Sequence, residues 1–116
     1  MKILIADNEL EIVALMKEYL EKKGCDVEVA YDGAHSFELI KFNKFDLVFL
    51  DHNMPEVTGL ELTTYIKKNF PDIKVVMITG YQQIDGFVAK SSGADEYLTK
   101  PFSLKVLDEI LIKYKI

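Results

Sequence analysis

Short apolar runs alternate with segments of helical spacing along the whole chain, and this alternation constrains the fold most strongly. The runs are Lys2–Ala6, Asp26–Ala30, Asp46–Leu50, Ile73–Ile78 and Glu96–Leu98. Four of them are nearly continuous in apolar or β-branched residues, which is typical of strands covered on both faces in a parallel sheet. The pattern therefore predicts five β-α units and a doubly wound α/β fold, with an open five-stranded parallel sheet and helices on both faces.

Capping residues mark where the helical segments begin. Asp32 and Ser103 are expected to cap the second and fifth helices, and "TGLE" at Thr58–Glu61 has the pattern of a capping box for the third. The fourth segment, residues 82–92, is the weakest predictor of a helix because Gly86 lies in its middle and costs roughly 1 kcal/mol relative to alanine. We expect five helices, the fourth being the least stable.

Composition limits the classes of function. The 116 residues are 49% apolar and 28% charged, as expected for one globular domain spanning 1–116. The apolar runs are far shorter than a membrane span and no signal segment opens the chain, so we expect a cytoplasmic protein without a membrane partner. The net charge is −5 and the lysines are scattered, which argues against a nucleic-acid partner. A protein or a cation is the expected partner.

Polar residues with chemical potential follow four of the predicted strands: Asp7, Asp51, Thr79 and Lys100. In a doubly wound sheet, ligands bind beyond the carboxyl ends of the strands. If the first and third strands are neighbours, the two carboxylates lie about 5 Å apart and repel by roughly 3 kcal/mol at an effective dielectric constant of about 20. Such a pair needs a cation, and hard oxygen ligands without nearby Cys or His favour Mg²⁺.

This set of groups is suited to phosphoryl transfer. Asp51 ends the most apolar strand and is the expected nucleophile, while Lys100 and the metal would neutralise phosphoryl oxygens and Thr79 would donate a hydrogen bond to one of them. Taken singly, each residue is better explained as an ordinary polar strand terminus. Their occurrence together at the ends of four strands favours a catalytic site.

Four stretches, "LIADNE", "DLVFLDHNMPEVTGLEL", "VVMITGY" and "GADEYLTKPF", resemble the receiver domain of two-component response regulators, in order and at matching spacing over the whole chain. The resemblance, to stand-alone receivers of the chemotaxis-regulator kind, implies a flavodoxin-like sheet of order 2-1-3-4-5. It also implies that Asp51 takes a phosphoryl group, with Mg²⁺, from a phosphohistidine on a histidine kinase or histidine phosphotransfer protein. The domain would then be a phosphoacceptor that assists its own phosphorylation and dephosphorylation, not an enzyme.

The resemblance also implies roles for individual residues. Asp7 matches the first residue of the family's acidic pair, and the backbone carbonyl of Asn53 matches its third metal ligand. Thr79 matches the switch hydroxyl and Tyr97 the aromatic switch residue. The Lys100–Pro101 bond matches one that family members commonly hold in cis.

Asn8 departs from the family pattern, which usually has an acid at this position that binds the metal directly. An amide oxygen can still coordinate Mg²⁺, but the site loses one negative charge, so metal affinity should fall. Glu9 is either a substitute for that acid or a first-turn helix acid favoured by the helix dipole, and the second interpretation is preferred.

Two surfaces are expected to meet partners. In the first helix, Ile12, Leu15, Met16 and Tyr19 are predicted to face the core. The remaining apolar residues of this helix, together with two residues that follow the fifth strand, would form a docking patch for a kinase helix. The predicted patch is Leu10, Val13, Ala14, Pro101 and Phe102. The alternative is that the helix has a wide apolar stripe that packs in the core. By resemblance, the output surface for a downstream protein target is helix four, strand five and helix five, where Phe87 and Val88 either switch or pack in the core.

Three functions are compatible with these features. The first is a phosphorylatable single-domain switch, acting through protein contacts because no output domain follows Ile116, either as a diffusible regulator or within a phosphorelay. The second, motivated by Asn8, is a non-phosphorylated receiver-like interaction module. The third, a small phosphate hydrolase, ranks last because it lacks an evident general acid near Asp51 and any lid. His52, beside Asp51, is expected to be a partly exposed loop residue that points away from the pocket.

Overall fold

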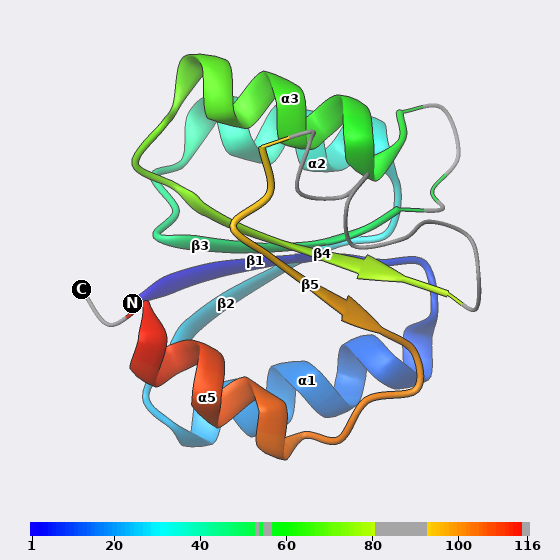
Figure 1. Ribbon diagram of the computed structural model, residues 1–116, viewed down its shortest axis with the longest axis vertical. Coiled ribbons are helices and arrows are strands. Elements are labelled where there is room, and N and C mark those ends of the chain that lie inside the picture. The colour runs from blue at the N-terminus through cyan, green and yellow to red at the C-terminus, as the bar shows by residue number, and fades with distance from the viewer. Residues whose placement is uncertain (53, 55–56, 81–92, 115–116) are drawn as a thin grey trace.

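The computed structural model describes residues 1–52, 54, 57–80 and 93–114. Five parallel strands form one sheet in the order β2-β1-β3-β4-β5, as predicted (Figure 1). The strands are β1 (Lys2–Ala6), β2 (Asp26–Ala30), β3 (Leu47–Asp51), β4 (Lys74–Thr79) and β5 (Glu96–Thr99). Four helices lie within the described residues: α1 (Leu10–Lys22), α2 (Gly33–Phe42), α3 (Gly59–Asn69) and α5 (Lys105–Lys113). The helix predicted over 82–92 lies outside them, and none of these four could cross a membrane.

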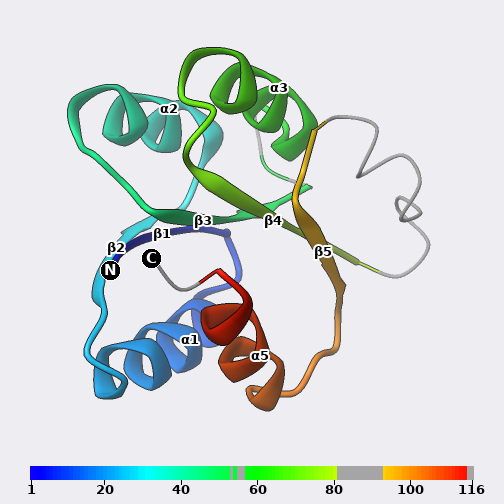
Figure 2. The same ribbon diagram turned by 60° about the vertical axis from the view of Figure 1, so that its left-hand side comes forward.

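The helices cover the two faces of the sheet in pairs. Figures 1 and 2 show α2 and α3 on one face and α1 and α5 on the other. Each pair closes a separate apolar cluster against the sheet, and the central strand β3 is buried along its full length. Burial on both faces explains why the sequence of this strand is continuously apolar up to its last residue.

The third and fourth strands lie one residue further along the chain than the sequence pattern predicted. Asp51 and Thr79 are therefore the last residues of β3 and β4, and do not follow them. Backbone pairing explains the shift: Asp51 is in register with Ile78, and the His52 N–H donates to the Ile78 carbonyl at 2.8 Å. The two polar side chains are consequently fixed by the sheet itself.

Side-chain caps begin α2 and α3 at the predicted positions. An Asp32 carboxylate oxygen accepts a hydrogen bond from the His35 N–H at 2.7 Å, and the Thr58 hydroxyl accepts one from the Glu61 N–H at 3.2 Å. The N-cap residue of α5 is Leu104 and not the predicted Ser103, although the Ser103 hydroxyl accepts a bond from the Lys105 N–H at 3.1 Å. Each cap satisfies a backbone donor that has no partner within its helix.

The buried face of α1 differs from the predicted one. Val13, Met16 and Leu20 are buried, whereas Leu15 is 54% exposed. The predicted assignment of Leu15 to the core and of Val13 to an exposed docking patch was therefore wrong. Both stripes have helical spacing, so the sequence alone does not choose between them; the orientation in which α1 meets the sheet buries Val13.

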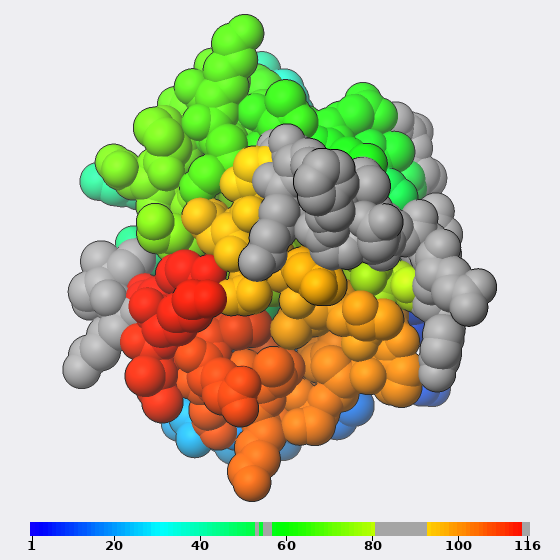
Figure 3. All heavy atoms as spheres, viewed as in Figure 1, coloured from blue at the N-terminus to red at the C-terminus, as the bar shows by residue number. Residues whose placement is uncertain are grey.

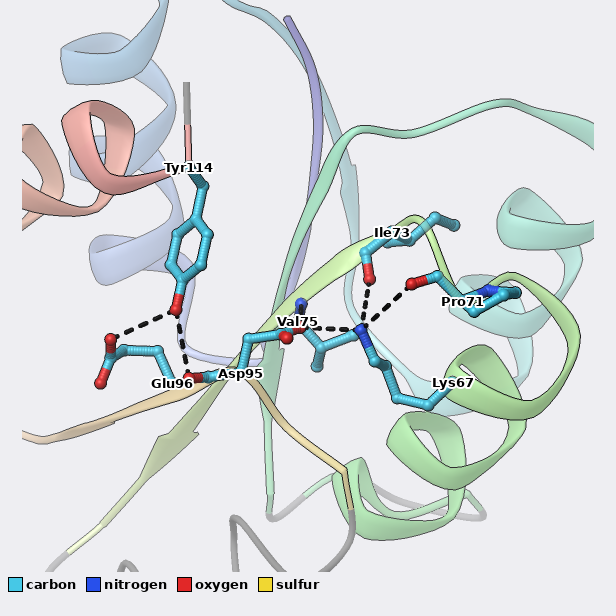
Figure 4. A network of polar contacts seen from close by, with 7 residues as sticks. All are labelled: Lys67, Pro71, Ile73, Val75, Asp95, Glu96 and Tyr114. Atoms are coloured by element: carbon cyan, nitrogen blue, oxygen red, sulfur yellow. Dashed lines mark hydrogen bonds and ion pairs between the residues drawn. The ribbon is translucent and has the colours of Figure 1, made fainter. Parts of the chain in front are cut away.

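The start of β5 is anchored to α3 by Lys67 (Figure 4). The Lys67 ammonium donates hydrogen bonds to Asp95 Oδ2 at 2.9 Å, to the Ile73 carbonyl at 3.0 Å and, more weakly, to the Pro71 carbonyl at 3.4 Å. Asp95 Oδ2 also accepts the Val75 N–H of β4 at 2.8 Å. Because β5 is a four-residue edge strand, this anchor helps to set the position of the chain that follows it.

The end of α5 is joined to the same part of β5. The Tyr114 hydroxyl donates to the Asp95 carbonyl at 3.1 Å and lies 3.3 Å from Glu96 Oε2, as Figure 4 shows. The Lys113 ammonium is 2.6 Å from the same Glu96 oxygen. Thus β5 is fixed from both faces of the sheet.

Candidate functional site

The four residues predicted from strand ends lie together at the carboxyl edge of the sheet. Asp7 directly follows β1, and its N–H extends the ladder to the Ala30 carbonyl at 3.0 Å. Asp51 and Thr79 end the adjacent strands β3 and β4, while Lys100 directly follows β5. Asp7 and Thr79 have no exposed surface and Asp51 is 3% exposed. Two carboxylates and a hydroxyl are thus held out of water by the backbone of three strands.

Among the described residues, Lys100 is the cation within reach of these carboxylates. Its ammonium lies 3.1 Å from Asp7 Oδ2, 3.7 Å from Asp51 Oδ2 and 2.6 Å from Glu9 Oε1. Burial by itself lowers the pKa of the Lys100 ammonium, but the hydrogen bond to Glu9 and the charges of Asp7 and Asp51 outweigh burial, so the pKa is raised above its usual value. Lys100 is therefore held as a cation at the centre of three acids.

The oxygens of Asp7 have different surroundings. Oδ1 accepts the Glu9 N–H at 2.9 Å and a longer bond from Lys100 at 3.4 Å. Oδ2 is buried and has no hydrogen-bond partner within the described residues, although the Lys100 ammonium is near it. A buried carboxylate oxygen without a donor is costly unless a cation balances it. A carboxylate oxygen such as Asp7 Oδ2 is a suitable ligand for a hard divalent cation such as Mg²⁺.

Asp7 and Asp51 are the carboxylates that would hold such a cation. Within the part of the chain that the structure describes, no group of three or more His, Cys, Asp or Glu residues could hold a metal. Asn8 is exposed beside Asp7, and the predicted carbonyl ligand Asn53 lies outside the described residues.

The two predicted switch residues lie on neighbouring strands. The Thr79 hydroxyl donates to the Leu98 carbonyl of β5 at 3.3 Å, and the Thr79 carbonyl accepts the Lys100 N–H at 2.8 Å. A move of this hydroxyl toward Asp51 would release its bond to β5. Tyr97, also on β5, is half-buried against the apolar cluster under α2 and α3. The other residues named for the switch, Phe87 and Val88, lie outside the described residues.

The predicted docking patch is in part exposed beside the site. Leu10 is 65% exposed and Ala14 and Pro101 are also exposed, while Phe102 is half-buried. A cleft of about 150 Å³ separates α1 from the segment after β5; it is lined by Ile12, Leu15, Met16, Lys100, Pro101, Phe102 and Leu104. The accessible patch thus contains Leu15 in place of the buried Val13. The Lys100–Pro101 bond is cis, as the resemblance implied.

Two residues near the site have structural roles that the sequence did not predict. Glu9 contacts Lys100, whereas the sequence favoured a role at the helix dipole. Gly59 begins α3 so close to the phosphoacceptor candidate that a Cβ would lie 2.7 Å from the Asp51 carbonyl oxygen and 2.8 Å from His52 Cα. The glycine after Thr58 in "TGLE" was the available signal for this close approach. His52 itself is partly exposed, as predicted.

Comparison with known proteins identifies the family. Residues 3–112 match the model of the response regulator receiver domain, so the chain belongs to this family of signalling phosphoacceptor modules. It is similar to the receiver domain of the Francisella response regulator 1452, with 33% identity, a TM-score of 0.89, and coverage of 98% of this chain and 96% of that one. A CheY-like receiver domain protein from Methanospirillum hungatei is 31% identical, with a TM-score of 0.90 and coverage of 97% and 92%. TrrA from Thermotoga maritima, solved with Mg²⁺ and BeF, is 33% identical, with a TM-score of 0.87 and 97% coverage of each chain.

Proposed function

We propose that this receiver domain is a phosphorylatable switch in which Asp51 accepts a phosphoryl group from a phosphohistidine on a histidine kinase or histidine phosphotransfer protein. The observation that carries the proposal is the position of Lys100. Its ammonium lies 3.1 Å from one buried carboxylate, Asp7, and 3.7 Å from a second, Asp51, on adjacent strands. A lysine placed between two buried carboxylates on adjacent strands supports a site in which the ammonium neutralises charge while one carboxylate, Asp51, acts as nucleophile.

In this reaction an oxygen of the Asp51 carboxylate attacks phosphorus. The O–P bond forms, the P–N bond to the donor imidazole breaks, and its electron pair remains on the imidazole nitrogen, which takes up a proton. Mg²⁺ held by Asp7 and Asp51 would neutralise charge on the phosphoryl oxygens. Lys100 would bind one of those oxygens, since its ammonium already faces Asp51, and Thr79 would donate to another after leaving the Leu98 carbonyl.

The switch would be read at the face formed by β5 and α5. Figure 3 shows the segment from β5 to α5 and α5 itself lying side by side on one surface. Thr79 is linked to this surface directly, because both its hydroxyl and its carbonyl bond to the chain of β5 and Lys100. A downstream protein bound there would sense release of the hydroxyl. The kinase or phosphotransfer helix would bind the accessible patch of Leu10, Ala14, Leu15 and Pro101 instead.

The test is a mass measurement after incubation with Mg²⁺ and phosphoramidate or acetyl phosphate. Wild type should gain one phosphoryl group and Asp51→Asn none. The Asp51 variant should unfold at a temperature no lower than wild type, since it keeps the shape of the side chain. Labelling of Asp51→Asn would place the acceptor elsewhere.

A second candidate is a receiver-like interaction module that is not phosphorylated. It is favoured by one observation, namely that Asp7 and Asp51 have no third acidic metal ligand among the described residues. In that case wild type would gain no mass with either donor at saturating Mg²⁺. A phosphoryl group on Asp51 excludes this second function.

A further inference from the structure

Glu9 makes the shortest contact of Lys100. Its Oε1 accepts a hydrogen bond from the Lys100 ammonium at 2.6 Å, although the two residues are separated by 91 positions in sequence. The Lys100 side chain is 12% exposed and that of Glu9 is 56% exposed, so the carboxylate covers the ammonium from the solvent side. The buried acids Asp7 and Asp51 lie further from the same nitrogen.

The backbone of Glu9 is fixed independently of this contact. Its N–H donates to Asp7 Oδ1 at 2.9 Å, and its carbonyl accepts the Val13 N–H at 3.1 Å as the first bond of α1. Glu9 occupies the N-cap position of α1, but its side chain makes no capping hydrogen bond. The side chain therefore extends from a rigid base toward Lys100 and does not serve to cap the helix.

The geometry of the ammonium suggests what this contact does. Lysine has three N–H donors: Glu9 and Asp7 accept from the Lys100 ammonium at 2.6 Å and 3.4 Å, and the Asp51 oxygen at 3.7 Å is beyond hydrogen-bond distance. We propose that Glu9 is a positioning residue, which holds the Lys100 ammonium back from Asp51 so that one of its protons remains for an incoming phosphoryl oxygen. This inference rests on the proposed phosphorylation of Asp51.

Without Glu9, the ammonium would move toward the buried carboxylates. A direct Lys100–Asp51 hydrogen bond would then withdraw negative charge from the nucleophile and lower its reactivity toward phosphorus. Ion pairs that are exposed on one side are worth up to about 1 kcal/mol, which corresponds to a rate effect of about fivefold.

Three variants separate contact from charge. Glu9→Ala removes the carboxylate without loss of a cap, and Glu9→Asp keeps the charge on a side chain shorter by one methylene. Glu11→Ala is the matched control, because Glu11 is an exposed acid in the first turn of the same helix and makes no hydrogen bond or ion pair with Lys100 among the described residues. The first readout is the NMR signal of the Lys100 ammonium in ¹⁵N-lysine-labelled protein, assigned by its loss in Lys100→Arg and recorded without any phosphodonor. The second is the rate of Asp51 labelling by phosphoramidate as a function of donor concentration.

We expect Glu9→Ala and Glu9→Asp to broaden or shift the Lys100 signal and to lower the maximal labelling rate about fivefold, with the half-saturating donor concentration unchanged. Glu11→Ala should match wild type in both readouts. A Lys100 signal or a labelling rate unaffected by Glu9→Ala overturns the proposal, and so does wild-type behaviour of Glu9→Asp, which would show that charge suffices. If wild type takes up no phosphoryl group, the proposed function fails, while the NMR signal still decides whether Glu9 fixes Lys100.

Discussion

Replacing Lys67 by methionine measures how much the anchor at the start of β5 contributes to stability. Methionine retains the length and packing of the side chain but removes the ammonium, leaving Asp95 Oδ2 with the Val75 N–H and depriving the Ile73 carbonyl of its charged donor. Hydrogen bonds to charged groups contribute about 1.5–3 kcal/mol each when buried. The Lys67 and Asp95 side chains are 21% and 22% exposed, so solvent screens part of this.

To the free energy of unfolding we assign about 1.5 kcal/mol from the Lys67–Asp95 hydrogen bond at 2.9 Å and roughly 0.5 kcal/mol from the Lys67–Ile73 hydrogen bond at 3.0 Å. The weak bond to Pro71 is taken to contribute nothing. The expected loss is about 2 kcal/mol in the free energy of unfolding. For a domain of this size, that corresponds to a fall of roughly 8 °C in the unfolding midpoint.

Urea unfolding followed by circular dichroism at pH 7 without Mg²⁺ gives the free energy. Lys68→Met is the control, since Lys68 is the exposed neighbour in the same last turn of α3 and its loss has the same effect on the helix dipole. A double-mutant cycle with Asp95→Asn then isolates the pairwise energy. If Lys67→Met lies within about 0.5 kcal/mol of Lys68→Met, the anchor is not a stabilising network and the reasoning from these contacts is refuted.

Two further predictions concern the switch and pH. Thr79→Ala should still be labelled on Asp51, because the proposed nucleophile is the Asp51 carboxylate, but the NMR signals of β5 should no longer respond to labelling. An undiminished response would exclude the Thr79 hydroxyl as the link. Tyr19 donates a 2.6 Å hydrogen bond to Asp108, and this bond is the main cause of a lowered pKa of the Asp108 carboxyl. Because the pKa of Asp108 is lower in the folded state, its ionised form stabilises the fold at pH values above the unfolded-state pKa. This stability is lost as the pH falls through the folded-state pKa. Tyr19→Phe should thus be less stable than wild type at neutral pH, with a gap in thermal midpoint that narrows below about pH 4; a gap independent of pH would contradict this.

The strands were predictable because their physics is local. A strand buried on both faces must be continuously apolar, so each run in the sequence located a strand to within one residue, and the polar residue that ended the run located the site. The order of the strands in the sheet could not be predicted from such local patterns. It came from the resemblance to receiver domains, since several arrangements of five β-α units satisfy the same periodicity.

The buried face of α1 could not be read from the sequence because its helix is apolar around more than half of its circumference. Ile12, Leu15 and Met16 form one stripe and Val13, Met16 and Leu20 another, and both have helical spacing. The choice depends on how α1 packs against β1 and β3, which is a tertiary property. The consequence for function is that Leu15, and not Val13, is available to a docking partner.

The roles of Asn8 and Glu9 also depend on tertiary structure. The sequence indicates that Asn8 removes one negative charge from the proposed metal site. The structure shows that the next side chain brings an acid into contact with Lys100. Asp7, Glu9 and Asp51 carry three negative charges against the single positive charge of Lys100, and the remaining two would be balanced by Mg²⁺. The question is whether Glu9 replaces the missing acid or acts differently.

The double variant Asn8→Asp/Glu9→Ala answers it, because it moves the acid by one residue without changing the net charge. If the two positions were equivalent, the double variant would match wild type in Mg²⁺ affinity and in labelling rate. Since Glu9 contacts the lysine and Asn8 lies next to Asp7, the proposed metal ligand, we expect the added acid at position 8 to tighten Mg²⁺ binding, as measured by titration calorimetry. At saturating Mg²⁺ we also expect the slower labelling of Glu9→Ala. Wild-type values for both quantities would show that only the total charge of the pocket matters.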